Sequence, residues 1–177
     1  GNVGGIVGRA EDTKITNAEN KENTVAGAHN VGGVAGFLTG DSTVSIGVNN
    51  GGDITATGAR TDDDFARETV RGVSSDGNEN FIIGNIGGVV GYLFGDKARI
   101  KNSGNRGTVH SAEIGKNVAV VPDTAKAANV GGVVGKISSE TNGTLNMLQE
   151  IKDGKRTATV SNSYNTGDVR GYTGVGG

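Results

Sequence analysis

Small and apolar residues alternate in a seven-residue pattern, Asn-Val-Gly-Gly-Ile-Val-Gly, that opens the chain and recurs along it in nearly the same letters. We call it the glycine phrase; its copies are residues 2–8, 30–36, 85–91 and 129–135, and a fifth begins near residue 174. Recurrence of one short pattern is the signature of a stacked-repeat architecture. The first apolar residues of the copies are 28, 55, 44 and 45 residues apart, so the shortest interval marks the undecorated unit: Val3, Val31, Ile86, Val130 and Val175.

A second pattern, the asparagine phrase, lies between successive copies. It is clearest at residues 160–169, Val-Ser-Asn-Ser-Tyr-Asn-Thr-Gly-Asp-Val, and residues 100–109 match it at both Asn, at the Gly and at both apolar ends. In the second repeat we align residues 50–54 with 165–169, which puts Gly47 in the place of Asn162. In the first repeat, residues 15–20 match, the run to Val25 is one residue longer, and Asn23 replaces the Gly.

Each unit offers three short apolar segments that Gly or Asn interrupts. Such segments are too short for helices and predict strand, turn, strand, turn, strand. Stacked units would bring equivalent residues about 4.8 Å apart and form a continuous interior. The sequence therefore predicts an all-β chain, a right-handed parallel β-solenoid of about four coils that forms one unit over residues 1–177.

The repeat register predicts which residues stack. The first apolar residues of the glycine phrase should form one column, and its later apolar residues a second column beside the first. The apolar residues that open the asparagine phrase should form a third column. Both Asn positions of that phrase should form hydrogen-bonded amide ladders. The paired Gly should be required by a positive φ or by close backbone approach. The expected sets are Val3, Val31, Ile86 and Val130; Ile6, Val34, Val89 and Val133; Ile15, Ile100 and Val160; Asn17, Asn102 and Asn162; and Asn20, Asn50, Asn105 and Asn165.

Three insertions interrupt the repeats, at residues 55–84, 110–128 and 136–159. The first contains a predicted short helix over 61–72, since acidic residues open it and Arg71-Gly72 closes it. The third carries Asp153-Gly154 between alternating segments, a type I′ hairpin signal. The second holds the only Pro, Pro122, after an apolar run, and we expect a strand and a loop there.

Composition narrows the classes of protein to which the chain could belong. The 33 Gly of 177 residues far exceed the usual share of about 7% but fall in register, which argues against a disordered linker. Aromatic residues make up 4%, too few for an ordinary two-layer core. The net charge of −2 does not provide the basic surface that nucleic-acid binding requires. No apolar stretch approaches the roughly 18 residues of a membrane span. Both ends fall inside a repeat, so we expect the chain to continue into a longer protein.

Paired carboxylates are the first candidate for chemistry, because parallel β-coils include polysaccharide hydrolases and lyases with two acids on one face. Asp53 and Asp168 occupy equivalent positions, but other residues fill that place in the remaining units, which favours solvent-facing turn acids. A second acidic group could bind Ca²⁺, although acids at a helix N-terminus are the favoured interpretation. It consists of Asp62, Asp63, Asp64 and Glu68.

Other patterns resemble known sites without completing them. His29 and His110 lie at repeat turns with no second His or Cys at ligand spacing, which argues against a zinc site or a catalytic triad. Residues 131–137 resemble a P-loop because Lys136 follows a Gly, but Ile137 stands where the Mg²⁺-binding Ser or Thr would be. With no Cys there is no thiol chemistry. The sequence therefore predicts no catalytic, cofactor-binding or metal-binding residue.

Aromatic residues follow the glycine phrase in two repeats. Phe37 and Tyr92-Leu93-Phe94 stand where Arg9 and Lys136 stand in the other copies. They could form a small patch that binds a sugar or a protein. Packing beneath an insertion is the favoured interpretation.

The alternation of the glycine phrase with Asn-Ser-Tyr-Asn-Thr-Gly-Asp-Val at residues 162–169 resembles the Glug motif. This repeat occurs in large bacterial surface and secreted proteins, including adhesin-like proteins and immunoglobulin-A-cleaving zinc metallopeptidases. The resemblance covers the four repeat cores and not the insertions. It implies a non-catalytic segment of an exported bacterial protein, extracellular or attached to the cell surface. The metallopeptidase signature His-Glu-x-x-His is absent here, so no peptidase activity carries over.

Three functions remain open. The first is a structural and adhesive stalk that displays its insertions to a host protein or glycan. The second is an accessory β-solenoid of a secreted immunoglobulin-cleaving metallopeptidase, which positions substrate for a catalytic domain of the same chain. The third is a carbohydrate-binding or carbohydrate-active β-helix, for which no paired constellation of acids is evident.

Overall fold

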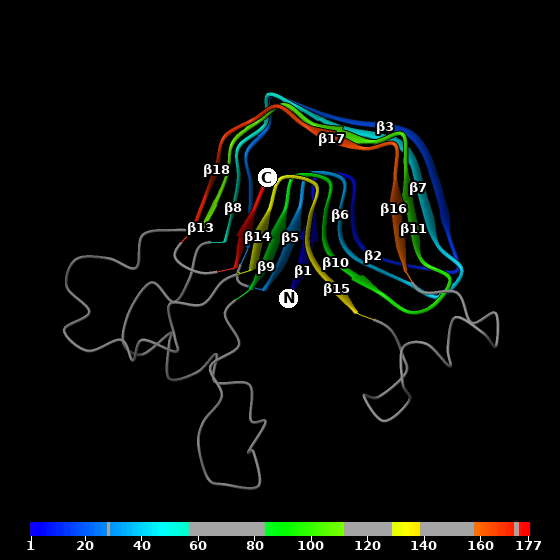
Figure 1. Cartoon of the computed structure of the whole chain (residues 1–177). Helices are drawn as coiled ribbons and strands as arrows, with labels where there is room; N and C mark the ends of the chain where they lie inside the picture. The colour runs from blue at the N-terminus through cyan, green and yellow to red at the C-terminus, as the bar shows by residue number, and fades with distance from the viewer. Residues whose placement is uncertain (28, 57–83, 112–128, 139–157, 172–173) are drawn as a thin grey trace, which may run out of the picture.

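The computed structural model describes residues 1–27, 29–56, 84–111, 129–138, 158–171 and 174–177. These residues form 19 strands, and no helix occurs among them. The strands make four sheets in which every pairing between named strands is parallel (Figure 1). The prediction of an all-β chain with parallel strands is confirmed for the part that the structure describes.

We label the sheets A to D in the order in which the chain visits them. Sheet A contains β1 (Asn2–Gly4), β5 (Asn30–Gly32), β9 (Asn85–Gly87), β14 (Asn129–Gly131) and β19 (Val175–Gly176). Sheet B contains β2 (Val7–Glu11), β6 (Ala35–Thr39), β10 (Val90–Phe94) and β15 (Val134–Ser138). Sheet C contains β3 (Lys14–Lys21), β7 (Thr43–Asn50), β11 (Arg99–Lys101), β12 (Gly104–Asn105), β16 (Thr159–Ser161) and β17 (Tyr164–Asn165). Sheet D contains β4 (Val25–Gly27), β8 (Ile54–Ala56), β13 (Val109–Ser111) and β18 (Val169–Arg170).

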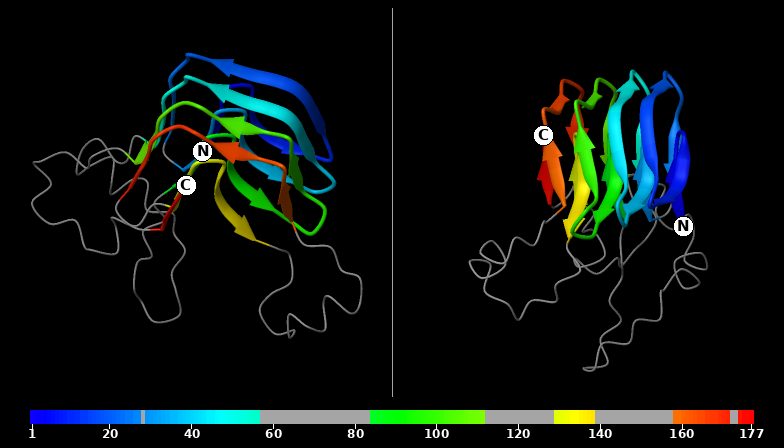
Figure 2. Two further views of the ribbon diagram at one scale, coloured as in Figure 1. Left: turned by 45° about the horizontal axis from the view of Figure 1, so that its top comes forward. Right: turned by 90° about the vertical axis from the view of Figure 1, so that its right-hand side faces the viewer.

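Each repeat passes through sheets A, B, C and D in that order, and the next repeat lies beside it (Figure 2). The glycine phrase supplies both a sheet A strand, which ends at the first Gly of the pair, and a sheet B strand, which begins two residues after the second Gly, as in β5 and β6. The sequence predicted three strands per unit, and this division gives four. The cause is steric, because two consecutive residues without a Cβ allow the chain to turn sharply within a single apolar segment.

The first predicted column is confirmed. Val3, Val31, Ile86 and Val130 pair in register from strand to strand of sheet A, and the last three are fully buried. They pack against the apolar residues of sheet D, which are Val25, Ile54 and Val109, with Val169 partly buried at the end of the stack. A fully buried Val or Ile contributes about 1.5–3 kcal/mol, so this column is a major source of stability.

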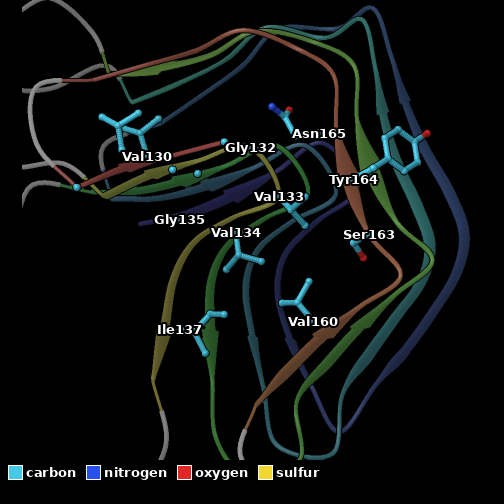
Figure 3. Close-up of a pocket in the computed structure, with 15 residues that line it drawn as sticks. Val130, Gly132, Val133, Val134, Gly135, Ile137, Val160, Ser163, Tyr164 and Asn165 are labelled. Carbon is cyan, nitrogen blue, oxygen red and sulfur yellow. The ribbon is translucent and has the colours of Figure 1, made fainter.

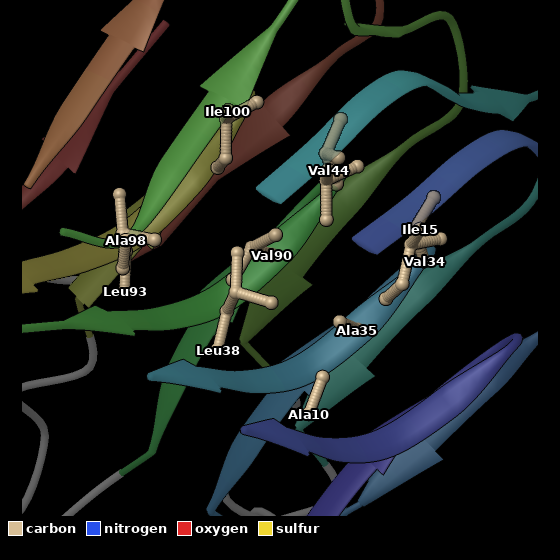
Figure 4. Close-up of a cluster of buried hydrophobic side chains, with 11 residues drawn as sticks. Ala10, Ile15, Val34, Ala35, Leu38, Val44, Val90, Leu93, Ala98 and Ile100 are labelled. Atoms are coloured by element: carbon tan, nitrogen blue, oxygen red, sulfur yellow. The ribbon is translucent and has the colours of Figure 1, made fainter. Parts of the chain in front are cut away.

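A second, separate column fills the space between sheets B and C (Figure 4). The sequence placed Ile6, Val34, Val89 and Val133 beside the first column; Val34, Val89 and Val133 belong to the second one instead, and Ile6 is 48% exposed. The reason is that the chain turns at the Gly pair, so the later half of the phrase faces sheet C. The expected column of Ile15, Ile100 and Val160 is confirmed in register, and Val44 completes it between Ile15 and Ile100.

The glycine pairs lie against a ladder of buried Asn side chains, which separates the two columns. None of these Gly has a positive φ, so close approach is what requires them. A Cβ on Gly88 would overlap the carbonyl oxygen of Gly132 in the next repeat and the side chain of Asn105. Gly33 and Gly132 meet Asn49 and Asn165 in the same way.

This inner ladder runs through the whole stack. Each Asn donates through Nδ2 to Oδ1 of the next, at 2.8 Å from Asn20 to Asn49, 2.7 Å from Asn49 to Asn105 and 2.7 Å from Asn105 to Asn165. The sequence assigned Asn50 to this ladder, and that is wrong: Asn50 pairs with Lys21 in register. The second repeat, like the first, has a turn that is one residue longer before the sheet D strand, which shifts the alignment by one.

The second predicted ladder does not exist. Asn17, Asn102 and Asn162 are exposed and have φ of 54°, 49° and 48°, a left-handed conformation at the bend of sheet C. Asn reaches this region at lower cost than most residues because its short polar side chain bonds locally. Ile46, rather than Gly47, takes the equivalent place, with φ of 58°.

The sequence analysis missed an outer ladder on sheet A. It is formed by the Asn that opens each glycine phrase, with Nδ2 to Oδ1 distances of 2.7 Å from Asn30 to Asn2, 2.7 Å from Asn85 to Asn30 and 2.8 Å from Asn129 to Asn85. The recurrence of Asn at the first position of the glycine phrase could have indicated this ladder from the sequence.

The insertions are shorter than expected. Strand β8 runs to Ala56, β13 to Ser111 and β15 to Ser138, and β16 begins at Thr159. The expected helix over 61–72, the strand and loop before Pro122 and the hairpin at Asp153-Gly154 lie outside the described residues.

We expect Gly88→Val to abolish cooperative folding, because the new side chain would collide with the Gly132 carbonyl and with Asn105. Gly176→Val is a matched control, since a Cβ at that strand position meets nothing within 4 Å. Thermal melting followed by circular dichroism compares the two. A normal transition in Gly88→Val would show that close approach does not hold the turn.

We expect Asn49→Ala to destabilise the protein by about 2–4 kcal/mol, since it removes the buried hydrogen bonds that Asn49 makes to Asn20, Asn105 and Gly52. The side chain of the neighbour Asn50 bonds only to Glu19 among the described residues, in an exposed contact, so Asn50→Ala should cost less than about 1 kcal/mol. Chemical denaturation measures both values. Equal losses in the two variants would contradict the importance of the inner ladder.

Candidate functional site

The outer face of sheet B carries aromatic and cationic side chains in a row. Phe37 and Tyr92 pair in register, and Arg9 and Lys136 occupy the same position in the flanking strands. Phe94 lies two residues after Tyr92 on the same strand. We call these five residues the aromatic patch, and it brings together every residue that the sequence analysis proposed for such a site except Leu93.

Strand alternation explains why the rings face outward. Leu38 and Leu93, which directly follow Phe37 and Tyr92, are fully buried in the column between sheets B and C. Successive side chains of a strand point to opposite faces, so the rings lie on the other side of the sheet. Phe37, Tyr92 and Phe94 are each half-buried, and part of each ring therefore remains accessible.

The three rings contact one another. The centroids of Phe37 and Tyr92 are 5.2 Å apart with planes inclined by 48°, and Phe94 lies 6.3 Å from Phe37 and 5.9 Å from Tyr92. These separations fall within the range of favourable aromatic pairs, each worth about 0.5–1.5 kcal/mol beyond burial. The cluster is thus a fixed surface rather than three independent side chains.

A cation covers each end of the row. The guanidinium of Arg9 lies 5.5 Å from the centroid of the Phe37 ring, and Nζ of Lys136 lies 5.3 Å from that of Tyr92. Arg9 also forms an exposed ion pair of 2.8 Å with Glu11. Cation–π contacts at exposed sites contribute about 0.5–1 kcal/mol, so both cations remain available to an added ligand.

The patch also reaches the start of an insertion. The hydroxyl of Tyr92 lies 2.6 Å from Oγ of Ser138, the last residue of β15 before the third insertion. Accessible ring faces beside two cations suit stacking with a sugar ring or an apolar side chain, together with attraction of an acidic group. This arrangement supports binding and offers no nucleophile activated by a base.

The two acids proposed for general acid–base chemistry directly precede strands of sheet D, Asp53 before β8 and Asp168 before β18. Strand β13 separates Asp53 from Asp168, because Val109 pairs with the residues that follow each acid. Asp168 forms an exposed ion pair of 2.9 Å with Arg170, and Oδ1 of Asp53 lies 3.0 Å from Nε2 of His110. Each acid therefore has its own neighbour, which agrees with their interpretation as turn residues.

The remaining candidates are dispersed. Nδ1 of His29 lies 2.6 Å from the N-terminal nitrogen, far along the sequence from His110. The described residues contain no group of three or more His, Cys, Asp or Glu able to hold a metal ion. Lys136 lies in strand β15 and over the Tyr92 ring, not at the start of a helix, so residues 131–137 do not form a P-loop. Asp62, Asp63, Asp64 and Glu68 lie outside the described residues.

A hollow of about 520 Å³ opens at the C-terminal end of the stack (Figure 3). Its walls are the glycine phrase of the fourth repeat, Ile137 of β15, the facing part of sheet C with Val160 and Tyr164, and residues 174–177. In interior repeats the equivalent space is filled by the next repeat. The hollow therefore lies at the end of the described part of the core.

Comparison with protein-family models, curated proteins and solved structures finds no match for this chain. Nor do the described residues include any helix with the length and apolarity for crossing a membrane. Any functional conclusion therefore depends on the geometry of the repeats, the aromatic patch and the insertions.

We expect the purified chain to contain no stoichiometric zinc and to hydrolyse neither polysaccharides nor peptides, because it offers no ligand cluster and no nucleophile–base pair among the described residues. Elemental analysis and hydrolysis assays test this. Stoichiometric zinc, or turnover of any such substrate, would contradict the prediction, whereas weak Ca²⁺ binding near residues 62–64 would not.

Proposed function

We propose that this chain is a right-handed parallel β-solenoid of about four coils and a non-catalytic structural and adhesive module of an exported bacterial protein, extracellular or on the cell surface. The parallel register of all four sheets supports the solenoid, and the usual right-handedness of connections between parallel strands supports its hand. The resemblance of the two phrases to the Glug motif supports the exported origin.

One observation carries the display role. The strand ends that flank the three insertions, at β8 and β9, β13 and β14, and β15 and β16, lie along one side of the stack, at the bottom of Figure 1. Interior repeat residues are committed to stacking, whereas insertions are free to vary. Insertions that leave a repeat array on one face commonly form its binding surface. The partner would be a host protein or glycan.

A second candidate is carbohydrate binding at the aromatic patch, which the exposed ring faces and two cations favour. An accessory module of a secreted immunoglobulin-cleaving metallopeptidase, the alternative from the Glug resemblance, would use the same surfaces to position substrate or a catalytic domain. These functions differ in the molecule that the chain binds, since the same fold would serve each of them equally well.

The third insertion can be removed with connectors that the chain itself provides. Ser138 pairs with Phe94 and Thr159 with Arg99, so residues 95–98 bridge the same gap in the third repeat. Ala98 and Ala158 both pack against the core between sheets B and C. Replacing residues 139–157 by Gly-Asp-Lys, the sequence of residues 95–97, therefore keeps Ala158 and should leave the melting temperature unchanged.

We expect this variant to bind more weakly, by about tenfold or more, to the probe that the wild type retains, because the display surface is lost. The probes are a glycan array, immobilised immunoglobulin A and intact mammalian cells, measured by fluorescence. Replacing residues 57–84 and 112–128 in turn by Ala-His, the connector at residues 28–29, tests the other insertions. Undiminished binding after all three replacements would refute display, and Phe94→Ser would then test the aromatic patch.

A further inference from the structure

The charges of the aromatic patch are unevenly distributed. Arg9, at one end of the row, forms an ion pair of 2.8 Å with Glu11, which neutralises that end. Lys136, at the other end, is exposed and lies over the Tyr92 ring. It forms no ion pair with any residue that the structure describes. The unbalanced positive charge of the patch is therefore at the Lys136 end, three strands away from Glu11.

Hydroxyl groups lie at the same end of the patch. The Tyr92 hydroxyl is 2.6 Å from Oγ of Ser138, and Ser138 pairs in register with Phe94. Two hydroxyls that share one hydrogen bond keep a second hydrogen and free lone pairs for another partner. The Lys136 end thus brings together a cation, two hydroxyls and the rings of Tyr92 and Phe94, all within two adjacent strands, β10 and β15.

The outer ladder borders the patch on the side of sheet A. Gly36 directly precedes Phe37, and a Cβ added to it would lie 2.7 Å from the backbone oxygen of Asn30. A Cβ added to Gly8 would meet the backbone oxygen of Asn2 at 2.8 Å in the same way. Both Asn belong to the outer ladder, and each amide oxygen that accepts one bond there has a second lone pair for the hydroxyl of a ligand.

The patch extends along the stacking axis, across strands β2, β6, β10 and β15, which lie side by side in Figure 1. From Arg9 to Lys136 it covers three strand spacings, about 14 Å. A further repeat at either end would lengthen this face without covering it, since repeats add along the axis and not across the sheet. The patch therefore suits an extended chain of linked sugars better than a single small molecule.

We propose that the aromatic patch binds an acidic glycan, with a sugar ring against Tyr92 and Phe94 and its carboxylate or sulfate on Nζ of Lys136. The inference rests on the second candidate function, carbohydrate binding at this patch, and adds the class of sugar. The apolar C–H face of the sugar ring covers aromatic carbon, and its hydroxyls bond to those of Tyr92 and Ser138. The acid forms a charge-assisted hydrogen bond, the strongest single contact that the patch offers.

An acidic segment of a protein fits the patch less well. An Asp or Glu side chain brings an acid without hydroxyls or an apolar ring face, so it would use Lys136 and leave the rings uncovered. A neutral sugar would cover the rings but leave the charge of Lys136 without a partner. An acidic sugar carries the acid, the hydroxyls and the apolar face on one unit.

The test compares exposed charged side chains at the two ends of the row. Lys136→Gln removes the unpaired charge and should weaken the binding of acidic glycans at least about tenfold, whereas Lys136→Arg should retain it. The matched control combines Arg9→Gln with Glu11→Gln, which removes an ion pair from the same face without changing the net charge. It should alter the affinity less than about twofold. All these side chains are exposed, so every variant should keep the wild-type melting temperature.

Isothermal titration calorimetry gives the dissociation constants. The acidic probes are oligosaccharides of hyaluronan, which carries carboxylates, oligosaccharides of chondroitin sulfate, which carries sulfates as well, and sialyllactose. Carboxyl-reduced hyaluronan and lactose are the neutral counterparts, and polyglutamate represents an acidic protein segment. We expect at least one acidic glycan to bind about tenfold or more tightly than the neutral glycans and than polyglutamate.

Equal binding of acidic and neutral glycans, or an equal effect of Lys136→Gln and the control, would overturn the inference while carbohydrate binding at the patch stands. Polyglutamate that binds as tightly as the best glycan would assign the patch to an acidic protein partner instead. Failure of every probe to bind would overturn both the inference and the carbohydrate candidate. All the variants retain the three insertions, so none of these outcomes affects the display role.

Discussion

The contact between the glycine pairs and the inner Asn ladder is the constraint on which the rest of the structure depends. It lies between two apolar columns that are each only a few side chains wide. The absence of a Cβ at Gly33, Gly88 and Gly132 brings the turn close enough for the ladder to lie directly against it. The ladder in turn satisfies backbone carbonyls at the next turn, such as those of Gly52 and Gly107. The glycine pairs thus provide the space that the ladder needs, and the ladder provides hydrogen bonds for backbone carbonyls at the turns.

This arrangement explains how so few aromatic residues suffice. A single wide core needs bulky side chains to reach its centre, whereas two narrow columns are filled by Val, Ile, Leu and Ala. The aromatic residues that the described repeats do contain are then available for outer faces, and three of them gather on sheet B. The core and the outer face of sheet B therefore use different residues, so the aromatic patch can change without altering the core.

Much of this could be predicted from the sequence, because identical spacing fixes register. The column of Val3, Val31, Ile86 and Val130 followed from position alone. Asn49 was not recognised as a member of the inner ladder because Asn50 follows it directly. The turn after Asn49 is one residue longer than in the third and fourth repeats, so either Asn could be aligned with Asn105 and Asn165. Asn17 was misassigned because the same residue type serves both ladders and left-handed bends. The grouping of Phe37 and Tyr92 was visible, but their contact distances depend on strand pairing that no pattern gives.

The direction of the hydrogen bonds has a mechanical consequence. In all four sheets the backbone hydrogen bonds run along the stacking axis. A tensile force between the two ends of the stack therefore loads all the bonds of one interface together, and the interfaces bear that force in series. Repeat proteins of this kind interact only between neighbours, so the whole array can resist no more force than its weakest interface. An array built in this way would yield by releasing one repeat at a time, and would lengthen under load before it came apart.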